Sequence, residues 1–366
     1  MMHIAYLCSS KSWGGLELNH LRHAQWMKQR GHVVIMFVTQ DSPLHQHATD
    51  RQIPCTTIKH QPKYFAWRSA WRLTKFLKTY KITHVFIRDN RDMSLLASVK
   101  FLMGSNITTC YFMEMQLGVS KRGLFHTLRF SWVDFWFCPL KGLMDQVKNL
   151  TRVNPEKIHH LPSGIDFNGI KKIPKTEART ALKLPAEGVI FGLIGRFDRQ
   201  KGQLLTLEAM GHINNPNFFV VFLGEPTKNE YEDIGRLMDQ KIEEYQLHDR
   251  VYLRPFMQEV SGFYSAIDAL IMATKAETFG MVTLEALCAG IPVVGSNAGG
   301  TPELLGHGDF GELFESLNSK DLARALIHMS STTLELNLPH LQEHVKQFDH
   351  HLVCNNLERN LTKHHG

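Results

Sequence analysis

The stretch KAETFGMVTLEALCAGIPVVGSNAGGTPE, from Lys275 to Glu303, decides how the rest of the chain is interpreted. Its run T-L-E-A-L-C-A consists mostly of good helix formers, whereas the F-G-M-V before it contains a glycine and a β-branched residue. We therefore expect a loop that carries Glu277 and leads into a helix beginning near Val282 or Thr283, with Glu285 in the first turn. The glycine and the apolar I-P-V-V-G that follow predict a helix end and then a short buried strand.

The start of this helix is an expected anion site. A glycine-bearing loop at a helix N-terminus exposes free backbone N–H groups and the positive end of the helix dipole, which suits a phosphate. Glu277 and Glu285 cannot bind a phosphate, so we expect them to hold hydroxyl groups of a sugar or a ribose. Together these features predict a nucleotide-sugar site. The alternative is a helix with two solvated glutamates, because charged helix residues usually face water.

A second candidate phosphate site follows the predicted strand Val189–Ile194. The loop Gly195–Gly202 has the sequence GRFDRQKG, with Arg196 and Lys201 five residues apart. Arg supplies a bidentate fork and Lys a point charge, so both can be aimed at one diphosphate. As a bare pair, these side chains could equally be solvated. Gly224, at the end of the next predicted strand, marks a place for a ribose or base.

The N-terminal half opens with a predicted strand, His3–Leu7, and a predicted helix, Leu16–Arg30, joined by a loop that ends in Gly14 and Gly15. The loop lacks G-x-G-x-x-G, so it is no dinucleotide fingerprint. Its glycines admit two interpretations: a close approach to a ligand, or a tight turn that needs glycine for its backbone alone. Alternating strands and helices in both halves predict two doubly wound α/β domains.

Another candidate residue follows the predicted strand Ile107–Phe112. Ligands of open α/β sheets gather at the carboxyl ends of strands, so Glu114 is well placed to contact a substrate, with Gln116 as the other candidate. The preceding polar loop, Arg88–Asp92, lacks the Asp-x-Asp spacing of nucleotide-sugar metal sites. We expect it to be a strand-end loop that meets the acceptor.

Charge is unevenly distributed. Residues 1–170 contain 22 Lys/Arg and 10 Asp/Glu, a net charge of +12, whereas the remainder has a net charge of −6. A basic half indicates an acidic partner, such as a phosphorylated glycan or an anionic lipid, and no nucleic-acid module is recognisable. The predicted helix 64–81 and the segment 121–133 are both basic and aromatic. Such a helix could lie on an anionic membrane, or it could pack its aromatic stripe on the sheet and solvate its charges.

Length and composition limit the class of protein. A chain of 366 residues, 43% hydrophobic and 21% charged, is long enough for two domains with separate cores. The six cysteines are scattered without a C-x-x-C pair, which fits a reducing cytosol. We see no signal peptide, no run long enough to span a bilayer and no metal-binding histidine motif. These features predict a cytoplasmic protein with membrane contact only at its surface.

The motifs together resemble a known family. E-T-F-G-M-V-T-L-E-A, followed by A-G-I-P-V-V and G-G-T-P-E-L, is similar to the E-x7-E signature of family-4 retaining glycosyltransferases of GT-B fold, and GRFDRQKG matches their G-R-x-x-x-x-K-G motif. The resemblance implies two Rossmann-like domains facing a cleft. We expect an acceptor-binding domain over 1–170, a nucleotide-sugar domain over 186–340 and a C-terminal helix over 341–366 that crosses back to the first domain.

The resemblance also implies residue roles. Arg196 and Lys201 would bind the donor diphosphate, Glu277 the hydroxyls of the donor sugar and Glu285 the ribose. Many relatives carry a histidine near Glu114; this chain has none there, so Glu114 is the candidate catalytic helper. The expected donor-binding residues are Gly14, Gly15, Gly224, Phe256, Phe279, Gly280, Met281, Val282, Thr283 and Glu285.

The implied activity is a retaining transfer of a sugar from a nucleoside-diphosphate sugar, with UDP preferred. The expected acceptor is a glycan or glycolipid, such as lipopolysaccharide, and no metal cofactor is expected. Two alternatives remain. The chain could be another GT-B enzyme, such as a nucleotide-sugar epimerase or a glycogen-synthase-like polymerase. It could also be a catalytically idle sugar-nucleotide or glycan-binding module.

Overall fold

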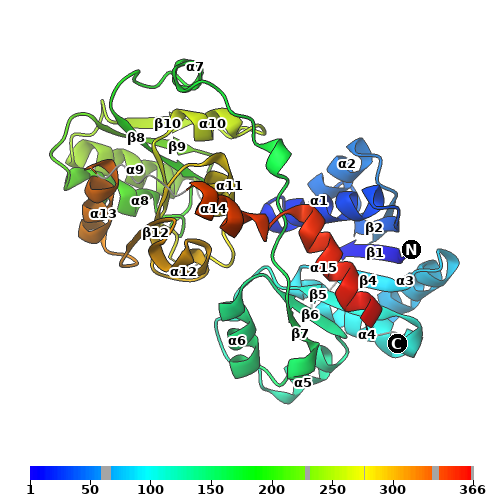
Figure 1. Ribbon diagram of the computed structural model, residues 1–366. Helices are drawn as coiled ribbons and strands as arrows, with labels where there is room; N and C mark the ends of the chain where they lie inside the picture. Colours follow the sequence, from blue (N-terminus) through cyan, green and yellow to red (C-terminus); the bar gives the residue numbers. More distant parts are fainter. Residues whose placement is uncertain (59–66, 227–230, 276, 332–337, 364–366) are drawn as a thin grey trace. The chain divides into compact units, whose positions relative to one another are not determined.

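The chain folds into two compact units, shown in Figure 1. The computed structural model describes residues 1–58, 67–226, 231–275, 277–331 and 338–363. Unit 1 comprises Met1–Gly164 and His350–Gly366, and unit 2 comprises Ile165–Asp349. Each unit has its own parallel sheet and its own hydrophobic core.

Unit 1 is built on a seven-stranded parallel sheet with the order β3-β2-β1-β4-β5-β6-β7. Its strands are β1 His3–Cys8, β2 Val33–Thr39, β3 Cys55–Ile58, β4 His84–Ile87, β5 Thr108–Phe112, β6 Phe135–Cys138 and β7 Ile158–His160. The central strands are almost wholly apolar and buried, as expected for a parallel sheet covered on both faces.

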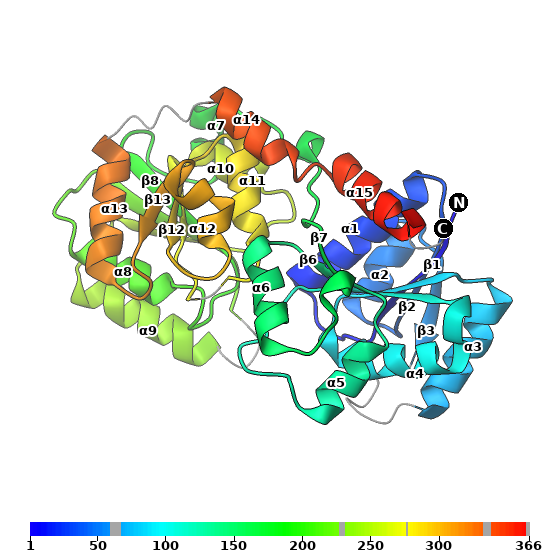
Figure 2. The same cartoon turned by 60° about the horizontal axis from the view of Figure 1, so that its bottom comes forward.

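The helices of unit 1 cover both faces of this sheet. They are α1 Gly15–Gln29, α2 Pro43–Asp50, α3 Trp67–Thr79, α4 Met93–Met103, α5 Leu124–Ser131, α6 Lys141–Leu150 and α15 His350–Lys363. Right-handed crossovers place α1 and α2 on one face and α3, α4 and α5 on the other, because the chain moves along the sheet in opposite directions on the two sides of β1. Figure 2 shows these two layers.

Unit 2 repeats the plan with a six-stranded parallel sheet of order β10-β9-β8-β11-β12-β13. Its strands are β8 Val189–Ile194, β9 Phe218–Leu223, β10 Val251–Arg254, β11 Ala269–Met272, β12 Val293–Ser296 and β13 Gly311–Phe314. Its helices are α7 Lys175–Ala181, α8 Gln203–Gly211, α9 Tyr231–Glu244, α10 Ser261–Ala266, α11 Met281–Ala289, α12 Thr301–Leu304, α13 Ser319–Ser331 and α14 Leu338–Lys346.

Both units also contain short 3₁₀ turns. Those of unit 1 are Asn90–Asp92, Gly104–Asn106 and Pro155–Lys157, and those of unit 2 are Phe167–Gly169 and Gly306–Gly308.

The predicted fold class, two doubly wound Rossmann-like domains, is confirmed. The C-terminal segment differs from the expectation of one helix over 341–366. It forms two helices, α14 in unit 2 and α15 in unit 1, because Gln347 and Phe348 interrupt the helical run with a turn. The amide of Ile165 donates to the carbonyl of Phe348 (2.8 Å), so the two chain crossings between the units lie next to each other.

The helix predicted over 64–81 is observed as α3; its first three predicted residues lie outside the described part of the chain. Its packing differs from the predicted aromatic stripe. The buried side chains of α3 are Ala70, Leu73, Thr74 and Leu77, whereas Trp67 and Trp71 are about half exposed. The tryptophans therefore do not pack on the sheet.

Candidate active site

Unit 2 gathers its predicted donor residues where the strand order changes direction. The chain runs outward from β8 to β9 and β10, then returns to β11 on the other side of β8. Ligands of open α/β sheets bind at such a point, because the loops after the two neighbouring strands diverge there. The loop after β8 carries Arg196 and Lys201, and the loop after β11 carries Glu277.

Glycines allow the strand ends to approach closely at this edge. A Cβ on Gly224 would lie 2.0 Å from the carbonyl oxygen of Gly195, so a side chain at this position would force β8 and β9 apart. Gly202 has φ +87°, and a Cβ there would lie 2.5 Å from Ala273 at the end of β11. Gly224, predicted as a donor contact, thus has a structural reason to be glycine whatever it binds.

The main chain of the loop after β8 is held by hydrogen bonds. Gln203 donates from Nε2 to the carbonyl of Arg196 (2.9 Å). Oδ1 of Asp198 accepts from the amides of Gln200 (2.8 Å) and Lys201 (3.1 Å). Since these bonds fix the main chain of the loop, they also fix the Cα positions from which the side chains of Arg196 and Lys201 extend; the Arg196 side chain is exposed.

Lys201 and Glu277 meet across the two loops. Nζ of Lys201 lies 3.1 Å from Oε2 of Glu277, and the side chains are 31% and 20% exposed. A partly solvated pair of this kind stabilises the fold only modestly. Its chemical value is a cation and a hydroxyl acceptor held side by side where a ligand can reach both.

The N-terminus of α11 adjoins Glu277. Gly280 precedes it at φ +90°, and a Cβ there would lie 3.2 Å from Cγ of Glu277. The amides of Met281, Val282 and Thr283 have no intrahelical acceptor because they lie in the first turn, and no side chain caps the helix. The hydroxyl of Thr283 is buried and has no hydrogen-bond partner among the described residues. Unit 2 therefore combines an uncapped helix N-terminus with the Lys201–Glu277 pair.

Glu285 lies one or two residues farther along α11 than expected, just beyond the first turn, because the helix begins at Met281 rather than at Val282 or Thr283. Its Oε2 accepts a hydrogen bond from the hydroxyl of Tyr264 (3.0 Å), which is fully buried on α10. Tyr264 therefore orients this carboxylate.

Two predicted donor-binding phenylalanines differ in their surroundings. The Phe279 side chain is buried and packs against Phe348, with ring centroids 5.8 Å apart. Any ligand contact at this position must therefore involve the backbone. Phe256 lies in the loop after β10 and is 59% exposed, so its ring is open to a ligand.

In unit 1, the equivalent change of strand order lies between β1 and β4. The amide of Ser9, at the end of β1, donates to Oδ2 of Asp92 (3.0 Å). Arg91 contacts Asp89 through both Nε and Nη2 and donates to the hydroxyl of Ser10 (3.2 Å). The loops after β1 and β4 are thus joined. Asp92 is fully buried, and burial raises its pKa to about 7 against the opposing hydrogen bond from Ser9.

Gly14 and Gly15 stand at the start of α1. Gly14 has φ −169°, an extended conformation that any residue adopts, and a Cβ on Gly15 would meet nothing within 4 Å. The turn therefore does not need glycine for its backbone, which favours the interpretation that a ligand approaches closely.

Glu114 is less accessible than its predicted role requires. It forms an ion pair with Arg88, and the two side chains are only 9% and 7% exposed. Asn19 on α1 donates to the same carboxylate (3.4 Å). Burial raises the pKa of Glu114, while the charge of Arg88 opposes the shift.

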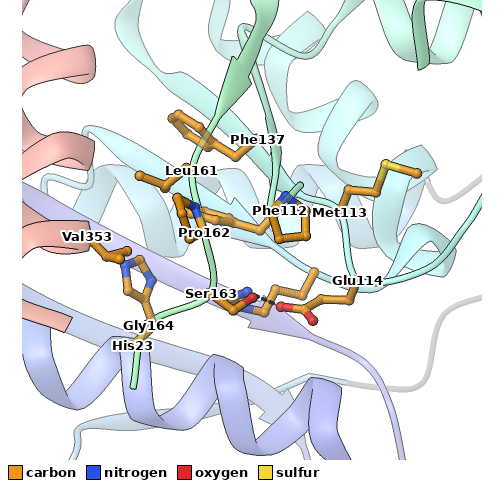
Figure 3. Close-up of a pocket in the computed structure, with 12 residues that line it drawn as sticks. His23, Phe112, Met113, Glu114, Phe137, Leu161, Pro162, Ser163, Gly164 and Val353 are labelled. Atoms are coloured by element: carbon orange, nitrogen blue, oxygen red, sulfur yellow. Dashed lines mark hydrogen bonds and ion pairs between the residues drawn. The ribbon is translucent and has the colours of Figure 1, made fainter. Parts of the chain in front are cut away.

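Figure 3 shows Glu114 near Ser163, with His23 beside Val353 farther along the wall of the same small cavity. The cavity volume is about 10 Å³, room for a single water molecule. Burial and the charge of Arg88 lower the pKa of His23, so this histidine is neutral. The pocket is therefore too small for a sugar, so a sugar can contact Glu114 only from the edge of the pocket.

Sequence reasoning missed three residues that position this machinery: Arg88 beside Glu114, Tyr264 beside Glu285, and Asp92 between the loops of unit 1. Arg88 and Asp92 were visible only as parts of a polar strand-end loop. Tyr264 lies in a stretch, SGFYSAIDA, that has no recognisable motif. No sequence signal identified Tyr264 as the hydrogen-bond partner of Glu285.

The two units match two family models. Residues 13–168 match the model described as Glycosyltransferase Family 4, and residues 174–340 match the one described as Glycosyl transferases group 1. The chain is a glycosyltransferase of GT-B fold. Together the two matches span both Rossmann-like units.

Curated relatives and solved structures agree with this family. The O-antigen biosynthesis glycosyltransferase WclY of Escherichia coli is 25% identical over 302 residues, which cover 81% of this chain and 80% of WclY. A D-inositol 3-phosphate glycosyltransferase of Stackebrandtia nassauensis is 29% identical over 186 residues, 49% of this chain and 42% of the relative. The chain therefore spans most of WclY but less than half of the inositol-phosphate enzyme.

Among solved structures, Anabaena Alr3699/HepE in complex with UDP has a TM-score of 0.88 at 19% identity, covering 99% of this chain and 100% of that one. The lipopolysaccharide outer core galactosyltransferase WaaB has a TM-score of 0.75 at 16% identity and covers 99% of each chain. Likeness at these identities establishes the shared fold.

Within the described ranges, no helix is both long enough and apolar enough to cross a bilayer. The same ranges hold no cluster of three or more His, Cys, Asp or Glu side chains suited to a metal ion.

Proposed function

We propose that this glycosyltransferase transfers a sugar from a UDP-sugar to a glycan or lipid-linked glycan, with retention of anomeric configuration. The observation that carries the proposal is the Lys201–Glu277 pair beside the uncapped N-terminus of α11. A cation, free amides and a hydroxyl acceptor are the groups that a nucleoside diphosphate bearing a sugar requires.

Each group has a role in the proposed reaction. Arg196, Lys201 and the amides of residues 281–283 bind the diphosphate and stabilise the charge that develops as it departs. Glu277 accepts hydrogen bonds from the hydroxyls of the donor sugar, and Glu285 from the ribose. The leaving phosphate takes the proton of the acceptor hydroxyl on the same face, so no separate base is needed. Because Lys, Arg and the helix terminus supply the positive charge, no metal cofactor is required.

Unit 1 supplies the acceptor side in this proposal. Gly14 and Gly15 leave room beside the start of α1, and the basic half of the chain suits a phosphorylated or lipid-linked acceptor. The printed names of WclY and WaaB support a glycan of the O-antigen or lipopolysaccharide type. The protein would be cytoplasmic and peripheral at the inner face of the membrane. UDP in the Alr3699/HepE complex supports a uridine donor.

Titration with UDP-, GDP- and ADP-sugars, followed by thermal shift and by release of free nucleotide, tests the donor. We expect stabilisation by the uridine class alone and slow donor hydrolysis that persists in EDTA. Retention is tested by NMR of the anomeric configuration in the product. Stabilisation without any turnover would favour the idle binding module, and an isomerised nucleotide sugar would favour an epimerase.

Glu277→Gln and Lys201→Met test the site itself. Each removes one group of the pair, so we expect turnover to fall by at least about a hundredfold, the cost typical of losing one group that stabilises transition-state charge. Glu312→Gln, a substitution of a carboxylate on β13 that pairs with Arg324 and His328, is the matched control. Equal turnover in Glu277→Gln and the control would contradict the assignment.

A further inference from the structure

One face of unit 1 exposes large apolar side chains on three neighbouring helices. Trp67 and Trp71 on α3 are 50% and 55% exposed, Phe101 near the end of α4 is 57% exposed, and Leu124 and Leu128 on α5 are 82% and 62% exposed. Scattered single apolar residues are normal on a surface, but a contiguous group marks an interaction site. We call this surface, formed by the exposed side chains of α3, the end of α4 and α5, the basic aromatic face.

The basic aromatic face is continuous. The rings of Trp67 and Phe101 meet edge to face at 5.6 Å, and Phe101 meets Trp132, at the end of α5, at 5.5 Å. These contacts link α3 to α5 through α4, and Figure 2 shows the three helices in one layer on the same side of the sheet. The surface lies entirely within unit 1.

The charged side chains of α3, α4 and α5 are all positive. Between residues 67 and 133 the chain has only three acidic residues, Asp89, Asp92 and Glu114, and each is less than 10% exposed. Arg68, Arg72 and Lys75 are exposed on α3, and Lys121 and Arg122 precede α5.

The ammonium group of Lys75 lies 3.7 Å from the centroid of the Trp71 ring, so cations and aromatic rings share the same surface.

We propose that the basic aromatic face docks unit 1 onto an anionic lipid bilayer. Trp rings insert favourably at the headgroup level, and Lys and Arg side chains extend their charges toward anionic lipid. A second copy of this chain would fit poorly, because two copies would place like charges opposite each other, and the cores of protein interfaces are depleted in charged residues. The surface has the composition of a helix layer that lies in the membrane interface.

This inference goes beyond the transfer reaction, and only its purpose rests on the proposed function: docking would hold unit 1 where a lipid-linked acceptor is found. Sedimentation with vesicles tests the docking without any acceptor. We expect the full chain to sediment with vesicles that contain phosphatidylglycerol and to stay in solution with pure phosphatidylcholine. Binding should weaken as salt rises from about 0.1 M to about 0.5 M, because salt screens the charges.

The double variant Arg72→Glu/Lys75→Glu tests the charges. Each basic side chain near an anionic surface contributes about fivefold to partitioning, so loss of two should weaken binding by at least about thirtyfold. Arg236→Glu/Lys320→Glu, on exposed positions of unit 2, is the matched control and should bind like the unaltered chain. Leu124→Ser/Leu128→Ser tests the apolar part, with Ile327→Ser on α13 as its control.

Thermal shift with UDP-glucose separates this test from the proposed function, because the residues altered on the basic aromatic face lie in unit 1. A variant of the basic aromatic face that binds UDP-glucose as before but no longer binds vesicles would support docking. Failure of the unaltered chain to bind UDP-glucose would count against the proposed reaction alone. Equal vesicle binding of both charge-reversal variants, no binding by the unaltered chain, or a dimer that the Arg72→Glu/Lys75→Glu variant dissociates would overturn the proposal.

Discussion

At the scale of single residues, the orientation of Glu285 depends on Tyr264. The buried hydroxyl of Tyr264 donates a hydrogen bond to this carboxylate at 3.0 Å. Tyr264→Phe keeps the carboxylate but removes the hydrogen bond that orients it. If Glu285 holds the ribose, the Michaelis constant for the UDP-sugar should rise by about fivefold to tenfold, the value of one hydrogen bond to a charged group, with little change in kcat. Tyr252→Phe, whose hydroxyl bonds the carbonyl of Asp249, is the matched control in kinetic assays. Equal constants in both variants would exclude a positioning role.

Asp92 gives unit 1 a pH-dependent stability. Its pKa in the folded state is about 7, raised by burial above the ordinary value near 4 that the unfolded chain has. The folded state therefore holds the proton more tightly, and this site's contribution to stability is full below pH 4 and is lost as pH rises to 7. The slope is at most about 1.4 kcal/mol per pH unit. Asp92→Asn should flatten this pH dependence, and at pH 8 it should be more stable than the unaltered chain.

Urea unfolding of Asp92→Asn and of the unaltered chain between pH 5 and pH 8 measures this difference. Asp145→Asn, an exposed carboxylate on α6, is the control that should leave the pH profile unchanged. Parallel profiles for all three proteins would show that Asp92 keeps an ordinary pKa.

The residue scale also shows what the sequence could predict about the site. The spacing of Arg196 and Lys201, and that of Glu277 and Glu285, is visible in the chain because each pair lies within one local motif. The ion pair between Arg88 and Glu114 and the hydrogen bond from Tyr264 join residues on separate elements. Such partners are set by packing across the sheet and leave no local pattern. Accordingly, the sequence predicted Glu114 but not the buried arginine that limits its access.

At the scale of elements, the start of α11 depends on Gly280. Its φ is +90°, and a Cβ would lie 3.2 Å from Glu277, whereas Gly290 at the other end has φ +76° and nothing within 4 Å. Both Gly→Ala substitutions should cost about 1 kcal/mol through backbone strain. Only Gly280→Ala should also displace Glu277 and weaken UDP-sugar binding. Isothermal titration of both variants measures this difference, and equal weakening would mean that the strain alone is responsible.

Element boundaries followed the sequence where a residue type enforces them. Gly290 ends α11 as predicted, because its left-handed conformation suits glycine and stops the helix. The turn at Gln347 and Phe348 carries no glycine or proline, so the sequence predicted one helix where the structure has α14 and α15. The sequence also left open whether the tryptophans of α3 pack on the sheet or face outward, because helical spacing shows which residues share a face but not which face meets the sheet.

At the scale of the whole molecule, unit 1 is discontinuous and depends on α15. Four side chains of this helix, Val353, Cys354, Leu357 and Leu361, belong to the unit 1 core and are at most 2% exposed. Arg30 and His32 pair with Glu358, which lowers the pKa of that carboxyl to about 2. Removing one buried side chain of this size costs about 2–5 kcal/mol, and a domain has only about 5–15 kcal/mol in total.

A chain truncated after Asp349 should therefore lose the folded state of unit 1 while unit 2 keeps its own core. Calorimetry should show one transition in place of two, and UDP-glucose should still raise the temperature of the remaining one if unit 2 alone binds the donor. The point substitution Glu358→Gln is the milder control. It removes only a partly exposed ion pair, so it should lower the unfolding temperature of unit 1 by only a few degrees. Two intact transitions after truncation would show that residues 1–164 fold without α15, and a lost response to UDP-glucose would mean that donor binding needs both units.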